Sequence, residues 1–166
     1  MKTAVGYLID ASVFIQAARQ YYAFDIVPSF WPRLLNLAAD GTVFTIDRVY
    51  DEILRGKDAL AAWMVQHFSH GVVCSEESSV VETYSGIIKW VFDPNQEFRD
   101  YARNEFASGA DPWLIAYAAV HNCCVVTQET YKPGIMRKVP IPNVCRGFNV
   151  QYTDTFEMMR RLAVAI

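Results

Sequence analysis

One stretch near the amino terminus decides the fold: Gly6-Tyr7-Leu8-Ile9-Asp10-Ala11-Ser12-Val13-Phe14-Ile15. The apolar run from Tyr7 to Ile9 has no polar face, which is typical of a strand buried on both sides of a parallel sheet. From Ser12 onward the apolar residues follow helical spacing, and Ser12 is the expected N-cap. Asp10 therefore lies where a strand ends and a helix begins. In open α/β sheets ligands bind beyond this edge, although an aspartate here is also common as a turn residue or helix cap.

A second apolar run, 42–46, predicts another strand that leads directly into a helix. Asp47 is the expected cap of that helix, and Glu52 falls in its second turn beside the apolar stripe. Asp51 is rotated about 100° away and is the more natural surface residue, so Glu52 is the better candidate for a site. An ordinary charged face that includes both acids remains the alternative.

The third informative stretch is 108–119, in which Asp111-Pro112 is a strong signal for the start of a helix. Capping alone would explain the aspartate. The helix that follows is apolar nearly all round, so it should be buried, and it leads into a strand over 123–127. Glu129 follows that strand by two residues, which is almost the place that Asp10 holds after the first strand.

The other segments complete an alternation of strands and helices. Helices are expected over 31–39, 58–68, 79–92, 97–106 and 156–164, and short strands over 71–74 and 143–145. The aromatic segment 20–32 is expected to be an ordered loop, whose rings pack on the core or stack on bases. Capping boxes are expected at Ser79 and Asp154. This alternation predicts an α/β domain with a central parallel sheet and right-handed crossovers.

Length and composition limit the class of protein. The 166 residues suit one domain, 1–166, with 52% hydrophobic and 20% charged residues. No apolar run approaches the ~20 residues that cross a bilayer, and Asp10 interrupts the run nearest the start, so we expect no membrane segment and a cytoplasmic location. The four cysteines show no C-x-x-C spacing and are expected to be buried free thiols.

The formal net charge of −3 argues against a polyanionic partner. Its distribution weakens that objection, because if four carboxylates gather at one site the remainder carries −3 + 4 = +1. Three positive charges, Lys132, Arg137 and Lys138, follow closely behind Glu129 in a proline-rich loop. A basic loop beside acids would suit an RNA substrate, and a plain solvated loop is the alternative.

The carboxyl ends of parallel strands meet at one edge of a sheet, so Asp10 and Glu129 can share that edge, and Glu52 and Asp111 can face it. Four acids without an obvious cationic partner would repel one another, and a divalent cation resolves the repulsion. Oxygen ligands favour Mg²⁺ or Mn²⁺. Because such ions stabilise the charge that develops during attack on phosphorus, the residues indicate phosphodiester hydrolysis.

Four short motifs also occur in a characteristic order. They are Leu8-Ile9-Asp10-Ala11-Ser12, Tyr50-Asp51-Glu52-Ile53, Ala110-Asp111-Pro112-Trp113-Leu114-Ile115-Ala116 and Val125-Val126-Thr127-Gln128-Glu129. Together they resemble the motif set of the PIN-domain ribonucleases, and most closely a bacterial and archaeal PIN-like group related to the VapC toxins. The resemblance spans Tyr7 to about Phe148 and implies a three-layer α/β/α PIN-like fold with a central parallel sheet.

The resemblance also implies an activity. It makes Asp10, Glu52 and Asp111 the usual acidic triad and Glu129 a more variable fourth acid, and it implies an endoribonuclease that depends on Mg²⁺ or Mn²⁺. Its implied substrate is single-stranded or structured RNA. It further implies a homodimer and, in toxin members of a type II toxin–antitoxin pair, a small antitoxin as partner.

Two hydroxyls match supporting positions of the same family. The resemblance implies that Ser12 and Thr127 hold either a water on the metal or a neighbouring carboxylate. The aromatic insert 21–31 and the long basic loop after Glu129 exceed a minimal PIN domain, so the substrate preference does not carry over.

Two other classes of protein remain. A catalytically silent PIN-like module that binds RNA or protein would more naturally have lost one of the acids. A metal-dependent phosphatase or nucleotide-binding α/β protein is less consistent with the sequence, since Ser12 replaces the second acid of a D-x-D pair and no glycine-rich loop follows the first strand.

Overall fold

Five short strands form one sheet within residues 3–166, which are the residues that the computed structural model describes. The strands are β1 (Tyr7–Ile9), β2 (Val43–Ile46), β3 (Val72–Val73), β4 (Cys124–Val126) and β5 (Tyr152–Thr153). Their spatial order is β3-β2-β1-β4-β5, and every neighbouring pair is parallel. The prediction of a central parallel sheet is confirmed.

The middle of the sheet is formed by the two strands that precede Asp10 and Glu129. Leu8 of β1 lies opposite Val125 of β4, and both side chains are fully buried. The chain passes from β1 outward to β2 and β3 and then returns to β4 on the other side of β1. The strand order therefore reverses between β1 and β4, which is where open α/β sheets bind ligands.

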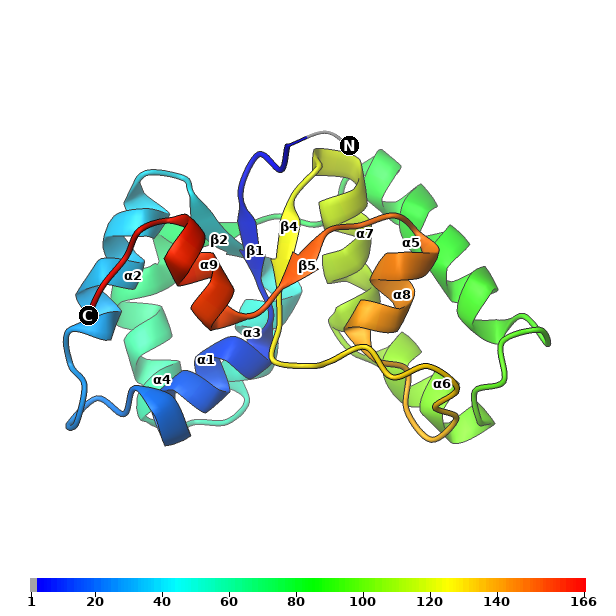
Figure 1. Ribbon diagram of the computed structural model, residues 1–166, viewed down its shortest axis with the longest axis horizontal. Coiled ribbons are helices and arrows are strands. Elements are labelled where there is room, and N and C mark those ends of the chain that lie inside the picture. The colour runs from blue at the N-terminus through cyan, green and yellow to red at the C-terminus, as the bar shows by residue number, and fades with distance from the viewer. Residues whose placement is uncertain (1–2) are drawn as a thin grey trace.

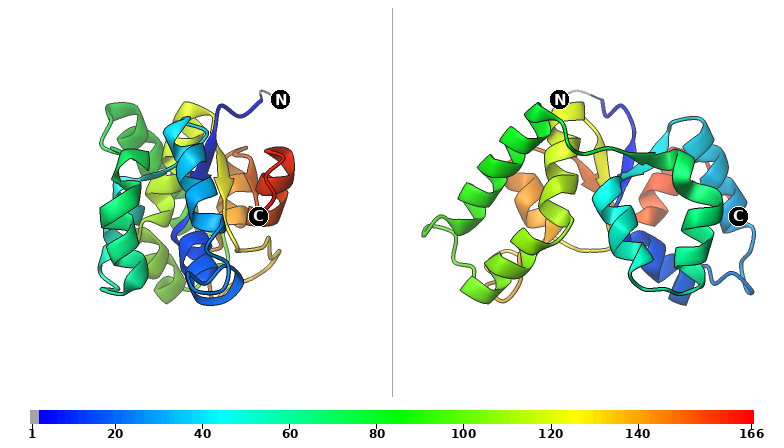
Figure 2. Two further views of the ribbon diagram at one scale, coloured as in Figure 1. Left: turned by 90° about the vertical axis from the view of Figure 1, so that its left-hand side faces the viewer. Right: turned by 180° about the vertical axis from the view of Figure 1, so that it is seen from behind.

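Helices cover both faces of the sheet, as Figures 1 and 2 show. One face carries α1 (Ala11–Gln16), the π-helical turn η1 (Ala17–Tyr21), α2 (Phe30–Ala39), α3 (Asp47–Leu54), α4 (Ala59–Trp63) with its continuation η2 (Met64–Phe68) and η3 (Ser69–Gly71), and α9 (Thr155–Arg161). The other face carries α5 (Ser78–Phe92), α6 (Asp100–Ser108), α7 (Asp111–His121) and α8 (Ile141–Gly147). The architecture is three-layer α/β/α.

The helix α7 is the buried helix that the sequence predicted. It lies between α5, β4 and α8, and its residues Leu114, Ile115 and Ala116 are inaccessible to solvent. Asn122 ends it in the left-handed conformation, with φ 53° and ψ 47°. This burial fixes where α7 begins, which places Asp111 near the strand ends.

The aromatic segment is ordered and packs on the core. The side chain of Trp31 is buried and its Nε1 donates a hydrogen bond of 2.8 Å to the backbone oxygen of Tyr22. The ring of Tyr22 stacks on Phe30, and Phe24 stacks on Trp31. Core packing is therefore the role that the structure gives to these buried rings.

Three local expectations are wrong. The segment 143–145 is not a strand but part of α8, because Ile141, Val144 and Cys145 are buried at helical spacing. Ser12 is not an N-cap, since α1 begins at Ala11 with Asp10 in the cap position. Ser79 does not cap α5, which begins at Ser78.

Of the other helix starts that the sequence predicted, one is confirmed and one is displaced. Asp154 accepts a hydrogen bond of 2.8 Å from the backbone nitrogen of Glu157, as a capping residue does. The helix expected over 97–106 begins later, at Asp100.

All four cysteines are free, as expected. The expectation that all of them are buried is wrong for Cys74, which is exposed, while the other three are buried. No helix within residues 3–166 combines the length and apolar character needed to cross a membrane.

Two helical glycines should respond in opposite ways to alanine. A Cβ at Gly147 would lie 2.7 Å from Cζ2 of the Trp90 indole, whereas a Cβ at Gly86, inside α5, would meet nothing within 4 Å. We expect Gly147→Ala to lower the free energy of unfolding by about 1–3 kcal/mol through overpacking. Gly86→Ala should raise it by about 0.5–1 kcal/mol. Thermal unfolding of both variants checks the pair, and a stabilised Gly147→Ala would contradict the packing described here.

Candidate active site

Asp10 is buried at the carboxyl end of β1. Only 3% of its surface is exposed, and its backbone nitrogen donates to the oxygen of Val126 at the end of β4. Its Oδ2 accepts two hydrogen bonds, from Oγ of Ser12 at 2.6 Å and from Oγ1 of Thr127 at 3.0 Å. The pKa of Asp10 is raised to about 6, because burial and, to a smaller extent, the charge of Glu129 raise it by more than the two hydroxyls lower it.

The two hydroxyls are oriented by the backbone that follows β4. Oγ of Ser12 accepts from the backbone nitrogen of Gln128 at 3.2 Å, and Oγ1 of Thr127 accepts from that of Glu129 at 3.1 Å. Each hydroxyl has one hydrogen, and each donates it to Asp10. The hydroxyls therefore hold the neighbouring carboxylate, which is one of the two roles implied for them.

Asp111 is the first residue of α7, but it is not a cap. Ala110 occupies the cap position, and no side chain there makes a capping hydrogen bond. The pKa of Asp111 is well above its usual range because of burial and then the charges of Asp10, Glu129 and Glu52. Capping thus fails to explain this aspartate, and the structure brings it into the electrostatic range of the other three acids.

Glu129 has a cationic partner that the sequence did not indicate. Its Oε1 lies 2.8 Å from Nζ of Lys138, and its Oε2 accepts a hydrogen bond of 2.8 Å from the backbone nitrogen of Ile141. Burial alone would lower the pKa of Lys138, but Glu129, Asp111 and Asp10 outweigh burial and raise it. The expectation of four acids without a cation within reach is therefore wrong.

Glu52 lies at the periphery of this group. It is exposed, as is Asp51, so the inward bias expected from its helical position is not observed. It lines a hollow of about 600 Å³ beside the start of α7. The wall of this hollow includes Trp113, and the guanidinium carbon of Arg48 lies 3.7 Å from the centre of the Trp113 ring. Among the charges that raise the pKa of Asp111, that of Glu52 has the smallest effect.

Asp47 is another residue whose expected role changes. It does not cap α3 but is the first residue of that helix, after Ile46. Its Oδ1 accepts hydrogen bonds from the hydroxyl of Ser75 at 2.6 Å and from the backbone of Arg48 at 2.9 Å. This aspartate ties α3 to the segment after β3.

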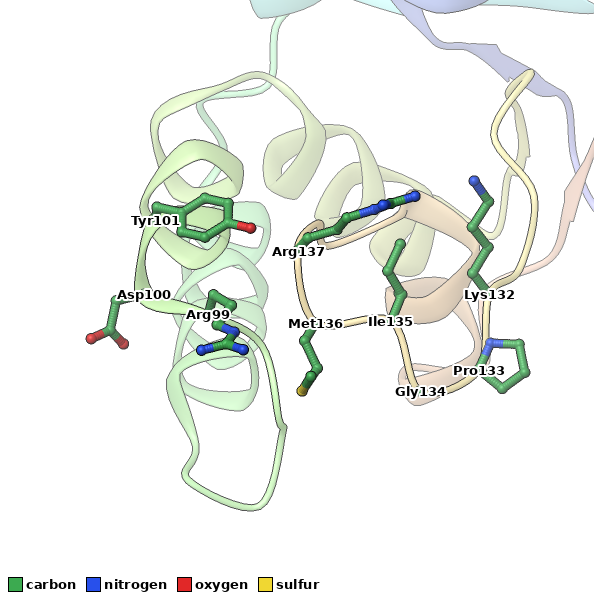
Figure 3. A pocket seen from close by; sticks show the side chains of 9 residues that line it. All are labelled: Arg99, Asp100, Tyr101, Lys132, Pro133, Gly134, Ile135, Met136 and Arg137. Carbon is green, nitrogen blue, oxygen red and sulfur yellow. The ribbon is translucent and has the colours of Figure 1, made fainter.

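The basic loop divides into two parts. Lys138 faces the acids, whereas Lys132 and Arg137 line a separate hollow of about 740 Å³ together with Arg99 and Tyr101 of the α6 region (Figure 3). The sequence placed the three cations of the loop together and gave no signal for Tyr101. It marked Arg99 as a helical charge that either contacts phosphate or is simply solvated, and nothing in its spacing connected it with a loop more than thirty residues away.

The carboxylate oxygens of the acidic residues are chemically suited to bind a hard divalent cation. Carboxylate oxygens are preferred ligands of Mg²⁺ and Mn²⁺. Burial is the main cause of the raised pKa values of Asp10 and Asp111, and the charges of neighbouring acids, which Lys138 offsets only in part at Asp111, add to it. The arrangement of these side chains, however, does not form a complete metal site. Among residues 3–166, no three His, Cys, Asp or Glu side chains are arranged so that they could hold one ion.

The fold and the site define a three-layer α/β/α protein with an acidic cluster, Asp10, Asp111 and Glu129, at the carboxyl edge of its parallel sheet. The profile of one protein family, described as a domain of unknown function, DUF4411, matches residues 7–166. The chain belongs to this family. A search of curated proteins found no match.

Replacement of Asp10 by asparagine should stabilise the protein without metal. The pKa of Asp10 in the folded protein, about 6, exceeds that of an unfolded aspartate, about 3.9. The unfolded chain therefore loses this proton at a lower pH than the folded protein does, and the free energy of unfolding falls as pH rises from about 4 to 6. In EDTA at pH 8, we expect Asp10→Asn to raise the free energy of unfolding by about 1–3 kcal/mol, because one amide oxygen can accept both hydroxyl bonds. Below pH 4 the gain should disappear.

Urea unfolding at several pH values measures this difference. Asp25→Asn is the matched control, because Asp25 is exposed and its replacement should change stability by less than about 0.5 kcal/mol. A destabilised Asp10→Asn at pH 8 would mean that the charged carboxylate is well accommodated.

Proposed function

We propose that this chain is an Mg²⁺- or Mn²⁺-dependent endoribonuclease. The observation that carries the proposal is that Asp10, Asp111 and Glu129 gather beside the point where the strand order of the parallel sheet reverses. Carboxylates that are at least partly buried and repel one another cost stability, and such groups are concentrated at functional sites. The ordered motifs that resemble those of PIN-domain ribonucleases support the same activity.

On this proposal, Asp10 and Asp111 would hold the ion together with Glu129, which pairs with Lys138 in this structure. Glu52, which lines the adjacent hollow, would supply the fourth carboxylate. The bound ion would offset the charge of the carboxylates and of the phosphodiester and would activate water for attack on phosphorus.

The chain's own groups have distinct tasks in this proposal. Ser12 and Thr127 keep the carboxylate of Asp10 in one orientation, and Lys138 balances the acids while no ion is bound. A carboxylate that is already oriented loses little further freedom on binding an ion. We expect these hydroxyls to matter for metal affinity more than for folding.

The proposal includes partners that the resemblance suggests. A homodimer and an antitoxin that covers the acidic cluster would suit a chain that is the toxin of a type II pair. An antitoxin that blocks this site would place a positive group beside Asp111, as Lys138 does for Glu129.

Cleavage of a mixed RNA pool tests the activity. With Mn²⁺ or Mg²⁺ the native chain should cut RNA, and EDTA should abolish cutting. Asp111→Asn should reduce the rate at least about 100-fold, equivalent to about 2.7 kcal/mol of transition-state stabilisation, because it removes a charged ligand without removing volume. Asp25→Asn serves as control, and cutting that survives in Asp111→Asn would contradict the site.

Removal of the competing cation should strengthen metal binding. Lys138→Met keeps the length of the side chain but frees Glu129 from its ion pair. Since a partly exposed ion pair contributes up to about 1 kcal/mol, we expect Mn²⁺ to bind about 2- to 5-fold more tightly by calorimetry. Lys89→Met is the control, as Lys89 lies exposed on α5. Weaker binding in Lys138→Met would assign the lysine a supporting role in place of a competing one.

A second candidate function also has an observation in its favour. The ion pair of Lys138 with Glu129 and the exposed position of Glu52 suit a PIN-like module that binds RNA or protein without cutting. Native chain that binds RNA, binds no Mn²⁺ and cuts nothing would favour this candidate.

A further inference from the structure

A hollow of about 740 Å³ is lined by none of the acids of the cluster. Its walls are the start of α6 and the loop 132–137. Figure 3 shows Arg99 and Tyr101 on one side and Arg137, Met136 and Lys132 toward the other, while the carboxylate of Asp100 points away.

The walls of this hollow are held in place by hydrogen bonds. The backbone nitrogen of Arg99 donates to the oxygen of Met136 at 2.8 Å, which joins the two walls directly. The amide of Asn143 bonds the backbone of Lys132 at both its nitrogen, 3.0 Å, and its oxygen, 2.9 Å. The guanidinium of Arg103 donates to three backbone oxygens, one in the last turn of α5 and two in the segment between α5 and α6. The hollow is therefore formed before any ligand arrives.

The charges of the hollow are unbalanced. Arg99, Lys132 and Arg137 are exposed, and within residues 3–166 none of them forms an ion pair. The one acid of the lining, Asp100, pairs with Arg103 at 3.3 Å. Three unpaired cations around one concave surface in a chain of net charge −3 indicate an anionic ligand.

The lining of the hollow also includes exposed aromatic and apolar side chains. Tyr101 is 60% exposed, and Met136 is 42% exposed. Exposed aromatic rings next to cations are the arrangement on which bases of single-stranded nucleic acid stack while the cations contact phosphates. A duplex has its bases stacked internally and would leave this ring without a partner.

We propose that this hollow binds the flanking nucleotides of a single-stranded RNA, with phosphates on Arg99, Lys132 and Arg137 and one base on Tyr101. The proposal rests on the proposed ribonuclease function and names how that site takes its substrate. Arg137 precedes Lys138, which contacts Glu129, so a strand seated in the hollow would continue toward the acids.

Anisotropy of a labelled 12-nucleotide oligouridine tests the hollow, measured in EDTA so that nothing is cut. The variant Arg99→Ala/Lys132→Ala/Arg137→Ala should bind about 10- to 100-fold more weakly at 0.1 M salt. Its slope of log affinity against log salt should be shallower by about 2, at ~0.7 per phosphate contact. The matched control Arg19→Ala/Arg33→Ala/Arg160→Ala removes three cations from η1, α2 and α9, on the other face of the sheet, and should bind as the native chain does.

A second pair of variants tests stacking apart from charge. Tyr101→Phe should retain affinity, whereas Tyr101→Ala should lose about 5- to 100-fold with the salt slope unchanged. Tyr101 is mostly exposed, so neither change should affect folding, and thermal unfolding verifies this.

Several results would overturn the proposal. They are an unchanged affinity in the triple variant, an equal loss in the control, a duplex of the same length bound as tightly as the single strand, or no binding by native chain at 50 mM salt. Binding with these signatures but no cleavage in Mn²⁺ would leave the hollow established and would refute the nuclease.

Discussion

The arrangement of the site depends on one buried carboxylate, that of Asp10, and the two hydroxyls that bond it. Ser12 lies near the start of α1 and Thr127 directly follows β4, so these bonds join the ends of β1 and β4 at the point where the strand order reverses. A carboxylate without such donors would be costly to bury. The same backbone that orients the hydroxyls, at Gln128 and Glu129, also leads the chain to the next acid.

The repulsion among the acids of this cluster lowers the stability of the folded protein. Asp111 is held at the start of the buried helix α7, and its pKa is raised first by burial and then by the charges of the other acids. Lys138 offsets part of this charge through Glu129. The acids carry more negative charge than the single ammonium of Lys138 balances, so the site is suited to bind a divalent cation. This is the physical basis for proposing metal-dependent chemistry.

The loop after β4 connects the acids with the basic hollow. It begins at Glu129, passes Lys132 and Arg137, and returns to Glu129 through Lys138 and the backbone of Ile141. Glu129 thus fixes both ends of the loop that forms one wall of the hollow. Any ligand that draws Glu129 away from Lys138 would also affect this wall, so the proposed ion and the proposed RNA would influence each other's binding.

The sequence by itself determined the alternation of strands and helices, the buried helix α7 and the position of Asp10 at a strand end. These features follow from local periodicity and from end signals such as the proline after Asp111. Local signals failed where two structures were locally compatible: 143–145 was assigned as a strand although its apolar spacing also fits the helix α8. Only the tertiary structure decided that Lys138 pairs with Glu129, that Glu52 remains exposed, and that Arg99 and Arg137 line one hollow. These contacts depend on loop paths and on how α6 lies against the returning chain, and residue spacing carries no information about either.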